Sequence, residues 1–346
     1  MRFSIIVPVY NVAPYLRECL DSIAIATREL LSESPRDGVE VICVDDGSTD
    51  GSAAILDAYG LGSDSSCVGF QLKVLHQSNA GVSAARNAAL DIALGEWLLF
   101  VDADDCLAAG ALARVSRVLR CSDAAIEFLA FGSTRFSDGT AVSRELMPSA
   151  EVEFLDYQSF FRRGIYHRNI WEGCYKRMAF GDLRFRVGVA MGEDKLYQAG
   201  VFARVKSVAL IRDRLYCYRV RPGSAVNSPM TAKKLVDRVN CRLAIDGLFD
   251  AAHRCPVGDE RAHALYMTEG FSRDYFGLGE SERELVRPHW DRVLRHYLKR
   301  ETAPWWCRFA SWCALTFRFD WVRYILFRTP FYFKQHGIHR RRRARG

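Results

Sequence analysis

The sequence lacks the features of a membrane-spanning, secreted or metal-cluster protein. Its 346 residues include eleven cysteines but no CxxC pair, so a cysteine-bound metal cluster is not expected, and an odd number cannot all pair as disulfides. No uncharged run approaches the roughly 20 apolar residues that span a bilayer. Residues 3–9 are too short and too strand-like for a signal peptide. These absences favour reduced cysteines and a cytoplasmic location.

The excess of positive charge lies at the C-terminal end of the chain, in residues 301–346. Residues 1–300 hold 38 basic and 39 acidic side chains, whereas residues 301–346 hold ten basic and two acidic ones. This last segment mixes arginines with tryptophan and phenylalanine, which is typical of an amphipathic helix on anionic lipid headgroups. A nucleic-acid arm and an aromatic face packed on the body are the alternatives. We favour an anionic membrane surface and expect no nucleic acid, because nothing in the body resembles a nucleic-acid module.

The first hundred residues alternate strand-like and helix-like patterns. Four apolar runs have the composition of strands covered on both faces, and they lie at 3–9, 39–46, 71–77 and 96–103. Between them lie helical stretches, of which one starts near Pro14 and another follows Ser78 or Asn79, either of which can cap it. This order predicts an α/β fold with a mostly parallel, doubly wound sheet, in which ligands bind beyond the carboxyl ends of the strands.

Polar residues follow three of these expected strands. ProValTyrAsn at 8–11 ends the first, a pair of aspartates at 45–46 ends the second, and three aspartates within 102–105 follow the fourth. One carboxylate would suffice at a helix N-terminus, whereas three in four positions repel one another unless a cation lies among them. Carboxylates combined with phosphate oxygens are the usual ligands of Mg²⁺ and Mn²⁺. The pattern therefore predicts a metal and nucleotide site at this edge.

The segments SIIVPVYN, VDDGSTDGS, NAGVSAARNAAL and GEWLLFVDADD occur in this order. Together they resemble glycosyltransferase family 2, whose inverting enzymes have the GT-A fold and often build bacterial cell-surface polysaccharides. The resemblance is close over 3–107 and looser to about residue 225. It implies a GT-A domain at 1–225, with a nucleotide-binding half at 1–107 and an acceptor half at 108–225. A helical region at 226–300 and the basic aromatic tail at 301–346 are expected to follow.

The resemblance also implies a donor site for a UDP-sugar. Asp102-Ala103-Asp104 is similar to the family's DXD motif, with Asp104 as the main ligand of Mn²⁺ or Mg²⁺ and Asp102 on the metal or the ribose. The loop after the first strand would line the nucleobase, and an aspartate of the VDD segment would accept a hydrogen bond from uracil. Arginines and a serine would reach the base and the phosphates. The donor-site residues implied in this way, besides the DXD motif, are Pro8, Val9, Tyr10, Asn11, Asp46, Arg86, Arg219, Arg221 and Ser224.

Gly192-Glu193-Asp194 resembles the family's ED motif. An inverting transfer needs a base that removes the acceptor hydroxyl proton. The resemblance implies Asp194 as that base and Glu193 as a residue that positions the acceptor. Acids also favour a helix N-terminus by themselves, so this interpretation stays open. Asp105 stays open between the metal and a helix cap, and Trp171 between a sugar and the core.

These observations predict an inverting, metal-dependent glycosyltransferase that moves a sugar from a UDP-sugar to a glycan or lipid-linked acceptor. It is expected to be peripheral on the cytoplasmic face of the inner membrane. One alternative is a non-catalytic sugar-nucleotide-binding protein, which would be expected to lose an acid at 102, 104 or 194. The other is a sugar nucleotidyltransferase, which needs a Gly-rich basic loop where this chain has Val9-Tyr10-Asn11. Family members often have an Asn-Lys pair after the tryptophan, where this chain has Glu172-Gly173, so acceptor contacts there are not carried over.

Overall fold

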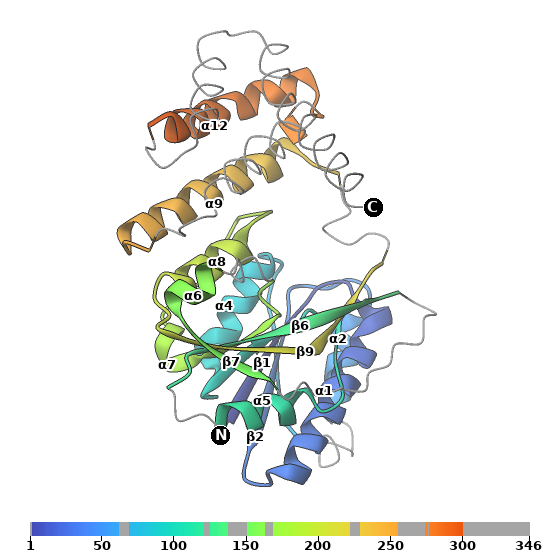
Figure 1. Cartoon of the computed structure of the whole chain (residues 1–346). Helices are drawn as coiled ribbons and strands as arrows, with labels where there is room; N and C mark the ends of the chain where they lie inside the picture. Colours follow the sequence, from blue (N-terminus) through green and yellow to red (C-terminus); the bar gives the residue numbers. More distant parts are fainter. Residues whose placement is uncertain are drawn as a thin grey trace, which may run out of the picture. The chain divides into compact units, whose positions relative to one another are not determined.

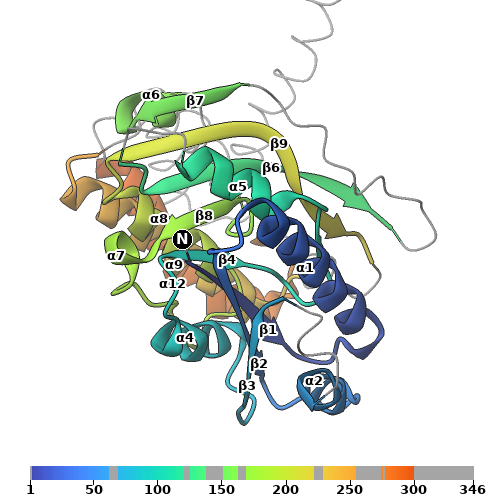
Figure 2. The same ribbon diagram turned by 90° about the horizontal axis from the view of Figure 1, so that it is seen from below.

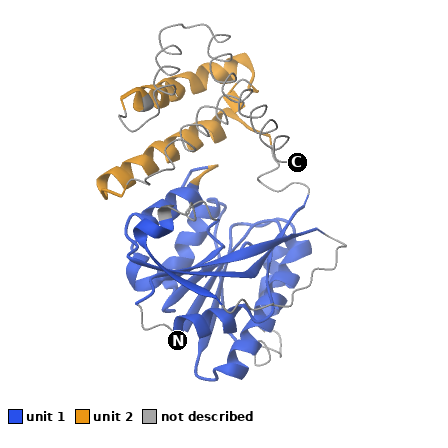
Figure 3. Ribbon diagram, viewed as in Figure 1, with its two compact units in different colours: residues 1–189, 193–228 blue, residues 190–192, 229–346 orange. Residues whose placement is uncertain are grey.

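The structure is a computed structural model of the chain (Figure 1), which describes residues 2–61, 69–120, 125–137, 151–162, 169–221, 229–254, 274–275 and 277–299. Ser224 and the tail at 301–346 lie outside the described residues. The chain divides into two compact units (Figure 3). Unit 1 comprises residues 1–189 and 193–228, and unit 2 comprises residues 190–192 and 229–346.

The first half of unit 1 is a parallel sheet. Its strands are β1 (Arg2–Val9), β2 (Gly38–Asp45), β3 (Gln71–His76) and β4 (Trp97–Phe100), and they run in the order β3-β2-β1-β4 with parallel pairing throughout. Helices α1 (Ala13–Glu33), α2 (Ser52–Leu61) and α4 (Val82–Ile92) connect them. Figure 2 shows α4 on one face of these strands and α1 and α2 on the other. This arrangement confirms the expected α/β class.

The second half of the sheet mixes parallel and antiparallel strands. Beyond β4 it continues as β8 (Gly173–Lys176), β6 (Phe128–Phe136), β9 (Ser207–Arg219) and β5 (Cys106–Leu107), and β7 (Val152–Asp156) also pairs with β9. Of these pairings only β6 with β9 is parallel. The other helices among the described residues of unit 1 are α5 (Ala111–Arg120), α6 (Tyr157–Arg162), α7 (Arg177–Phe180) and α8 (Glu193–Phe202).

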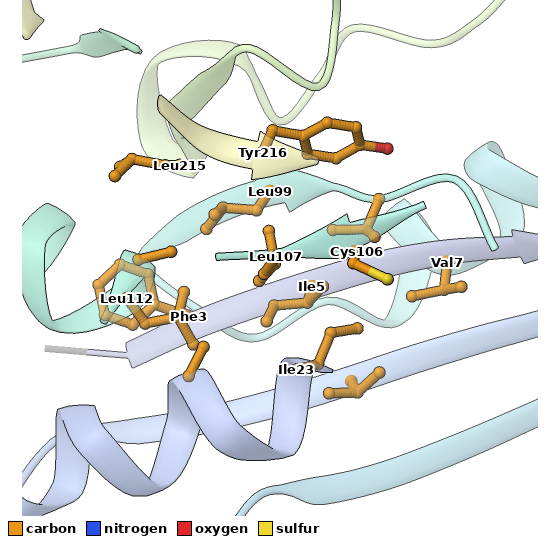
Figure 4. Close-up of a cluster of buried hydrophobic side chains, with 14 of the residues drawn as sticks. Phe3, Ile5, Val7, Ile23, Leu99, Cys106, Leu107, Leu112, Leu215 and Tyr216 are labelled. Carbon is orange, nitrogen blue, oxygen red and sulfur yellow. The ribbon is translucent and has the colours of Figure 1, made fainter. Parts of the chain in front are cut away.

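Alternate residues of β1 contribute to the core on the face of the sheet that α1 covers. Phe3, Ile5 and Val7 are fully buried and belong to one apolar cluster with Ile23 of α1 (Figure 4). The same cluster takes in Leu107 and other side chains of β5, β9 and α5. Burial of a side chain of this size contributes about 1.5–3 kcal/mol. The cluster therefore fixes β4 and β5 on either side of the aspartate segment.

The expected cap of α4 is wrong. Neither Ser78 nor Asn79 caps the helix, which begins at Val82 after Gly81 with no side-chain cap of its own. The Asp46 carboxylate, from the end of β2, instead accepts the N–H groups of Ala80 and Gly81 at 2.8 Å. Asp46 thus binds the backbone that leads into α4 and does not cap the helix itself.

The described part of unit 2 is helical, with α9 (Ala232–Ala251) and α12 (Glu280–Lys299). The two helices share an apolar cluster in which Leu235 and Val239 of α9 meet Val286, Trp290 and other side chains. Helix α12 continues through Pro288. Among the described residues, no helix has the length and apolar character to cross a membrane.

Candidate functional site

The carboxyl ends of β1, β2 and β4 meet at one edge of the sheet. Val9 of β1 pairs with Asp45 of β2, and Ile6 of β1 pairs with Phe100 of β4. At this edge Val9 is buried and Pro8 is half-buried. The three polar segments that follow these strands therefore lie side by side, as the sequence order indicated.

The loop after β1 is held by the segment after β2. Asn11, with φ of 50°, accepts the Thr49 N–H at 2.8 Å through its Oδ1, and its own N–H donates to Ser48 Oγ at 3.1 Å. Asp50 accepts the first N–H of α1 at 2.9 Å. Tyr10 is 49% exposed at this carboxyl edge of the sheet. Asn11 thus shapes the loop, and Tyr10 is the ring that the loop presents to solvent.

Asp46 is buried and nearly saturated with protein donors. Its Oδ1 accepts from Gln77 Nε2 at 2.7 Å and from the Ala80 N–H at 2.8 Å, and its Oδ2 accepts from the Gly81 N–H at 2.8 Å. An ionised carboxylate offers about four lone-pair sites. One acceptor site, on Oδ2, therefore remains for a further donor.

Arginines are the positive groups among the aspartates that follow β4. Arg86 Nη2 donates to Asp102 Oδ1 at 2.9 Å, and Arg221 Nε donates to Asp104 Oδ2 at 2.6 Å. Ala103 between them is buried. The side chains of Asp102 and Asp104 are 31% and 20% exposed. Both carboxylates are therefore open to a ligand while each holds one guanidinium.

Arg219 lies in the wall beneath this edge. It is 4% exposed, its Nε donates to the Asp104 carbonyl at 2.8 Å, and it forms an ion pair with Glu18. Its guanidinium lies over the rings of Tyr15 and Phe136, 5.0 and 4.4 Å from their centroids. In this position Arg219 supports the backbone of the acidic segment.

Asp105 is part of a buried network and not of a helix cap. Its carboxylate accepts the Tyr216 hydroxyl at 2.6 Å and the Arg219 N–H at 2.7 Å. The same hydroxyl accepts the Asp102 N–H at 3.1 Å. Burial, followed by the charge of Asp102, raises the pKa of Asp105 to about 8. The Tyr216 hydroxyl therefore links the backbone of Asp102 to the side chain of Asp105 by two hydrogen bonds.

The segment that contains Trp171 packs on β9. The Trp171 ring is stacked on Tyr216 and Tyr218, with centroids 4.4 and 5.4 Å apart and interplanar angles of 13° and 15°. Glu172 accepts the Asn169 N–H at 2.9 Å, which closes the turn before β8. One face of Trp171 is therefore covered by tyrosines, as the core interpretation expects.

Arg86 connects the acidic edge with the start of α8. It is 5% exposed, and its Nη1 lies 3.6 Å from Glu193 Oε1 while Nη2 holds Asp102. Its guanidinium also lies 5.3 Å from the centroid of Phe185. Burial raises the pKa of both acids, and the guanidinium opposes this rise. The structure thus brings together Asp102 and Glu193, which lie far apart in the sequence.

Glu193 and Asp194 form the first turn of α8, and both are half-buried. Asp194 Oδ1 accepts the Lys195 N–H at 2.7 Å, so it also has the local role expected at a helix N-terminus. Burial raises the pKa of Asp102, and the charges of Asp104 and then of Asp194 add to this rise. Burial lowers the pKa of Lys195, whose Nζ lies 3.5 Å from Asn169 Oδ1.

Three further residues of the site were not singled out from the sequence. They are Asp50 in GSTDGS, Lys195 directly after the ED pair, and Tyr216 in YCYR. Each lies beside a recognised motif, which is the signal that was available. Their partners are distant in the sequence, so their roles become visible only in the fold.

The residues present fit a divalent cation that is shared with a ligand. Two partly exposed carboxylates, those of Asp102 and Asp104, supply hard oxygen ligands, and the Arg221 guanidinium already lies on one of them. Among the described residues, no group of three or more His, Cys, Asp or Glu side chains could enclose a metal. One or two carboxylates completed by phosphate oxygens are the usual Mg²⁺ arrangement.

A half-parallel sheet with acids and arginines at the carboxyl edge of its strands defines a GT-A-type α/β domain. The chain belongs to glycosyltransferase family 2, because the model of the family described as Glycosyl transferase family 2 matches residues 4–184, just over half of the chain. This confirms the resemblance drawn from the four motifs.

Known proteins agree with this assignment. Glycosyltransferase GlyA of Streptococcus pneumoniae serotype 4 is 32% identical over 232 residues, which are 64% of this chain but only 31% of GlyA. The crystal structure of S. aureus TarS 1–349 in complex with UDP-GlcNAc covers 97% of this chain and 92% of its own, with a TM-score of 0.71 and 22% identity. Mannosyltransferase PcManGT of Pyrobaculum calidifontis, in complex with GDP-Man and Mn²⁺, has a TM-score of 0.51 and 18% identity, covering 94% of this chain and 84% of its own. The two structural likenesses show the fold.

Proposed function

We propose that the chain is an inverting, metal-dependent glycosyltransferase that transfers a sugar from a UDP-sugar to a glycan or lipid-linked acceptor in cell-surface polysaccharide synthesis. The observation that carries this proposal is the Arg86 bridge, which joins Asp102 at the end of β4 to Glu193 at the start of α8. This bridge supports a cation and diphosphate site near Glu193, the neighbour of the proposed base Asp194. The UDP-GlcNAc bound by TarS supports a UDP-linked donor.

Uracil recognition is assigned to Asp46. The acceptor site left on its Oδ2 suits the N3–H of uracil, whereas cytosine has an acceptor at N3 and would leave the buried carboxylate unsatisfied. A site built for one donor rejects a ligand that lacks it, because the buried group stays unpaired. Around the uracil, Tyr10 would provide the exposed aromatic ring, and Pro8, Val9, Asn11 and Ala103 would form the wall of the nucleobase site.

The diphosphate is assigned to the edge formed by Asp102 and Asp104. These carboxylates would hold Mn²⁺ or Mg²⁺, which supplies Lewis-acid stabilisation of the departing diphosphate when bound. Arg221, which holds the Asp104 carboxylate in the described structure, is the side chain placed to turn toward a phosphate. Arg219 keeps the backbone of this edge in place, and Ser224 stays a proposal from the sequence.

Asp194 is assigned as the base. It would take the proton of the acceptor hydroxyl as that oxygen bonds to the anomeric carbon and the bond from this carbon to the UDP oxygen breaks, which inverts the configuration. Glu193, held near Arg86, would fix the acceptor. Glu193 is half-buried near Asp102 and is assigned to acceptor binding alone, so Asp194 is the single base of the proposed reaction.

A thermal-shift panel tests the donor site. UDP, GDP, CDP and ADP are each added with Mn²⁺ or with a chelator. A ligand at about 100 times its dissociation constant adds roughly 2.7 kcal/mol of stability. Stabilisation by UDP that the chelator removes supports the proposal. If no nucleotide raises the melting temperature under either condition, the donor-site assignment fails.

We further propose that residues 301–346 bind the anionic cytoplasmic face of the inner membrane. The support is the sequence alone, with ten basic and two acidic residues among aromatics. Sedimentation with vesicles of phosphatidylcholine, with and without phosphatidylglycerol, tests this for the full chain against a chain that ends at residue 300. Salt-sensitive binding to anionic vesicles by the full chain alone supports it. Equal binding by both chains refutes it.

A further inference from the structure

The side chain of Asn87, on α4, holds both polar groups of the Phe185 backbone. Asn87 Oδ1 accepts the Phe185 N–H at 2.8 Å, and Asn87 Nδ2 donates to the Phe185 carbonyl oxygen at 2.9 Å. The two residues are 98 positions apart in the sequence, and both belong to unit 1. Because the amide uses a donor and an acceptor on the same residue, it fixes both the place and the direction of the backbone there.

The Phe185 ring contacts three elements of unit 1. It is buried, and it is stacked on the ring of Tyr197 in α8, with centroids 4.1 Å apart and an interplanar angle of 2°. It forms a T-shaped contact with Phe100, the last residue of β4, with centroids 5.5 Å apart. The guanidinium of Arg86, on α4, lies 5.3 Å from its centroid. Phe185 therefore packs against α4, β4 and α8 at once.

Each of these elements also contributes to the candidate site. Phe100 precedes Asp102 by two residues, and Arg86 donates to the Asp102 carboxylate. Tyr197 follows Asp194 by three residues within α8. Residues three apart on a helix are neighbours on one side of it, so a shift of the Tyr197 ring passes to the turn that contains Asp194. The Phe185 ring therefore joins the helix of the proposed base to the strand that precedes the aspartates.

We propose that Asn87 is a positioning residue for the transfer reaction, because it places the Phe185 ring against α8 and so sets Asp194 relative to the aspartates that follow β4. The inference rests on the proposed function in that Asp194 is the base. A misplacement of about 1 Å costs up to roughly 100-fold in rate even when the change lies far from the chemistry. Loss of the Asn87 amide is therefore expected to lower kcat. The donor KM is expected to stay unchanged, because Asp102 keeps its ion pair with Arg86.

Two variants separate positioning from general stabilisation. Asn87→Ala removes both hydrogen bonds to Phe185. Asp91→Ala is the matched control, because Asp91 lies one turn further along α4 and pairs at 2.7 Å with Arg184, the residue before Phe185, so it joins the same two segments. The side chains of Asp91 and Arg184 are 60% and 40% exposed, and such surface pairs contribute little. Should Asn87→Ala not fold, Asn87→Asp replaces it, since a carboxylate keeps the acceptor of the Phe185 N–H and lacks the donor to the carbonyl oxygen.

The activity readout is UDP released by water from the best of UDP-glucose, UDP-galactose and UDP-N-acetylglucosamine. We expect kcat to fall about 10- to 100-fold in Asn87→Ala, with the donor KM within about twofold, and to stay near the native value in Asp91→Ala. Equal kcat in Asn87→Ala and the native chain overturns the inference. A parallel rise of the donor KM, or an equal fall of kcat in Asp91→Ala, overturns it as well, since either outcome indicates a general structural loss.

A double-mutant cycle tests whether Asn87 acts through the Phe185 ring. Phe185→Leu removes the aromatic contacts and keeps an apolar side chain. If the ring carries the effect, Asn87→Ala lowers kcat by no more than about twofold further in the Phe185→Leu background. Losses of kcat that multiply in the double variant overturn this route, because they show two independent effects.

Hydrogen exchange supplies a readout that does not depend on activity. The Phe185 amide is expected to lose protection in Asn87→Ala and to keep it in Asp91→Ala. Unchanged protection in Asn87→Ala overturns the proposed anchor. A native chain that releases no UDP from any of the three donors contradicts the proposed function instead, and amide exchange then decides the anchor by itself.

Discussion

Replacement of Arg86 by methionine tests the electrostatic centre of the site. The guanidinium is 5% exposed, lies 2.9 Å from Asp102 Oδ1 and 3.6 Å from Glu193 Oε1, and faces the Phe185 ring. Methionine keeps part of the side-chain volume but leaves two half-buried carboxylates without their shared cation. Removal of one partner of a buried ion pair typically costs about 3–5 kcal/mol. For a domain of this size that loss lowers the melting temperature by roughly 6–20 °C.

The loss is expected to depend on pH. Burial raises the pKa of Asp102 and of Glu193, and Arg86 limits both rises. Without Arg86 both pKa values rise further, so stability falls as the pH rises through the range in which these acids ionise. The deficit of Arg86→Met should therefore be larger near pH 8 than near pH 5.

Thermal and urea denaturation at the two pH values measure this deficit. Arg204→Met is the matched control, because Arg204 pairs with Asp182 at 2.7 Å in an exposed pair, with side chains 46% and 70% exposed. Such surface pairs contribute about 0–1 kcal/mol. A loss in Arg86→Met no larger than that of the control, and equal at both pH values, would refute the reasoning that this arginine neutralises the two acids.

Three other substitutions have expected outcomes. Tyr216→Phe removes the hydroxyl that accepts the Asp102 N–H, and a buried group left unsatisfied costs about 1–3 kcal/mol in urea denaturation; no measurable loss would contradict the network. Arg221→Met frees the Asp104 carboxylate, so Mn²⁺ without nucleotide should raise the melting temperature of this variant more than that of the native chain. His76→Ala should be more destabilising near pH 6 than near pH 8.5. Two carboxylates raise the pKa of His76 above its ordinary value of about 6.5, so its stabilisation is present below that value and is lost as the pH rises through the raised one.

Local pattern was enough to predict the parallel half of the sheet. The runs that became β1 to β4 are rich in Val, Ile and Leu and are separated by helical stretches, so their order and direction follow from simple rules. In the second half, strand β8 was not predicted. Strand β8 has only four residues, Gly173–Lys176, and it is defined by pairing with β4 and β6. Such pairing is decided by distant contacts and not by local propensity.

The candidate site, too, could be predicted only in part from the sequence. The acids at the strand ends were predictable because parallel strands bring their carboxyl ends to one edge. The partners of these acids were not, since Arg86 and Glu193 are separated by more than a hundred residues. The cap of α4 was mispredicted because the helix begins after Gly81 with no side-chain cap, while Asp46, which follows β2, binds the backbone that leads into the helix.

Asp194→Asn tests the central claim most directly. UDP binding in the presence of Mn²⁺ is measured by calorimetry, and UDP release from the preferred UDP-sugar is measured beside it. A general base contributes about 10²–10⁴-fold, so the account predicts native UDP affinity with turnover reduced at least 100-fold. Turnover within threefold of the native value, with UDP still bound, would show that Asp194 does not remove the proton, and the assignment of the reaction to this edge of the sheet would be contradicted.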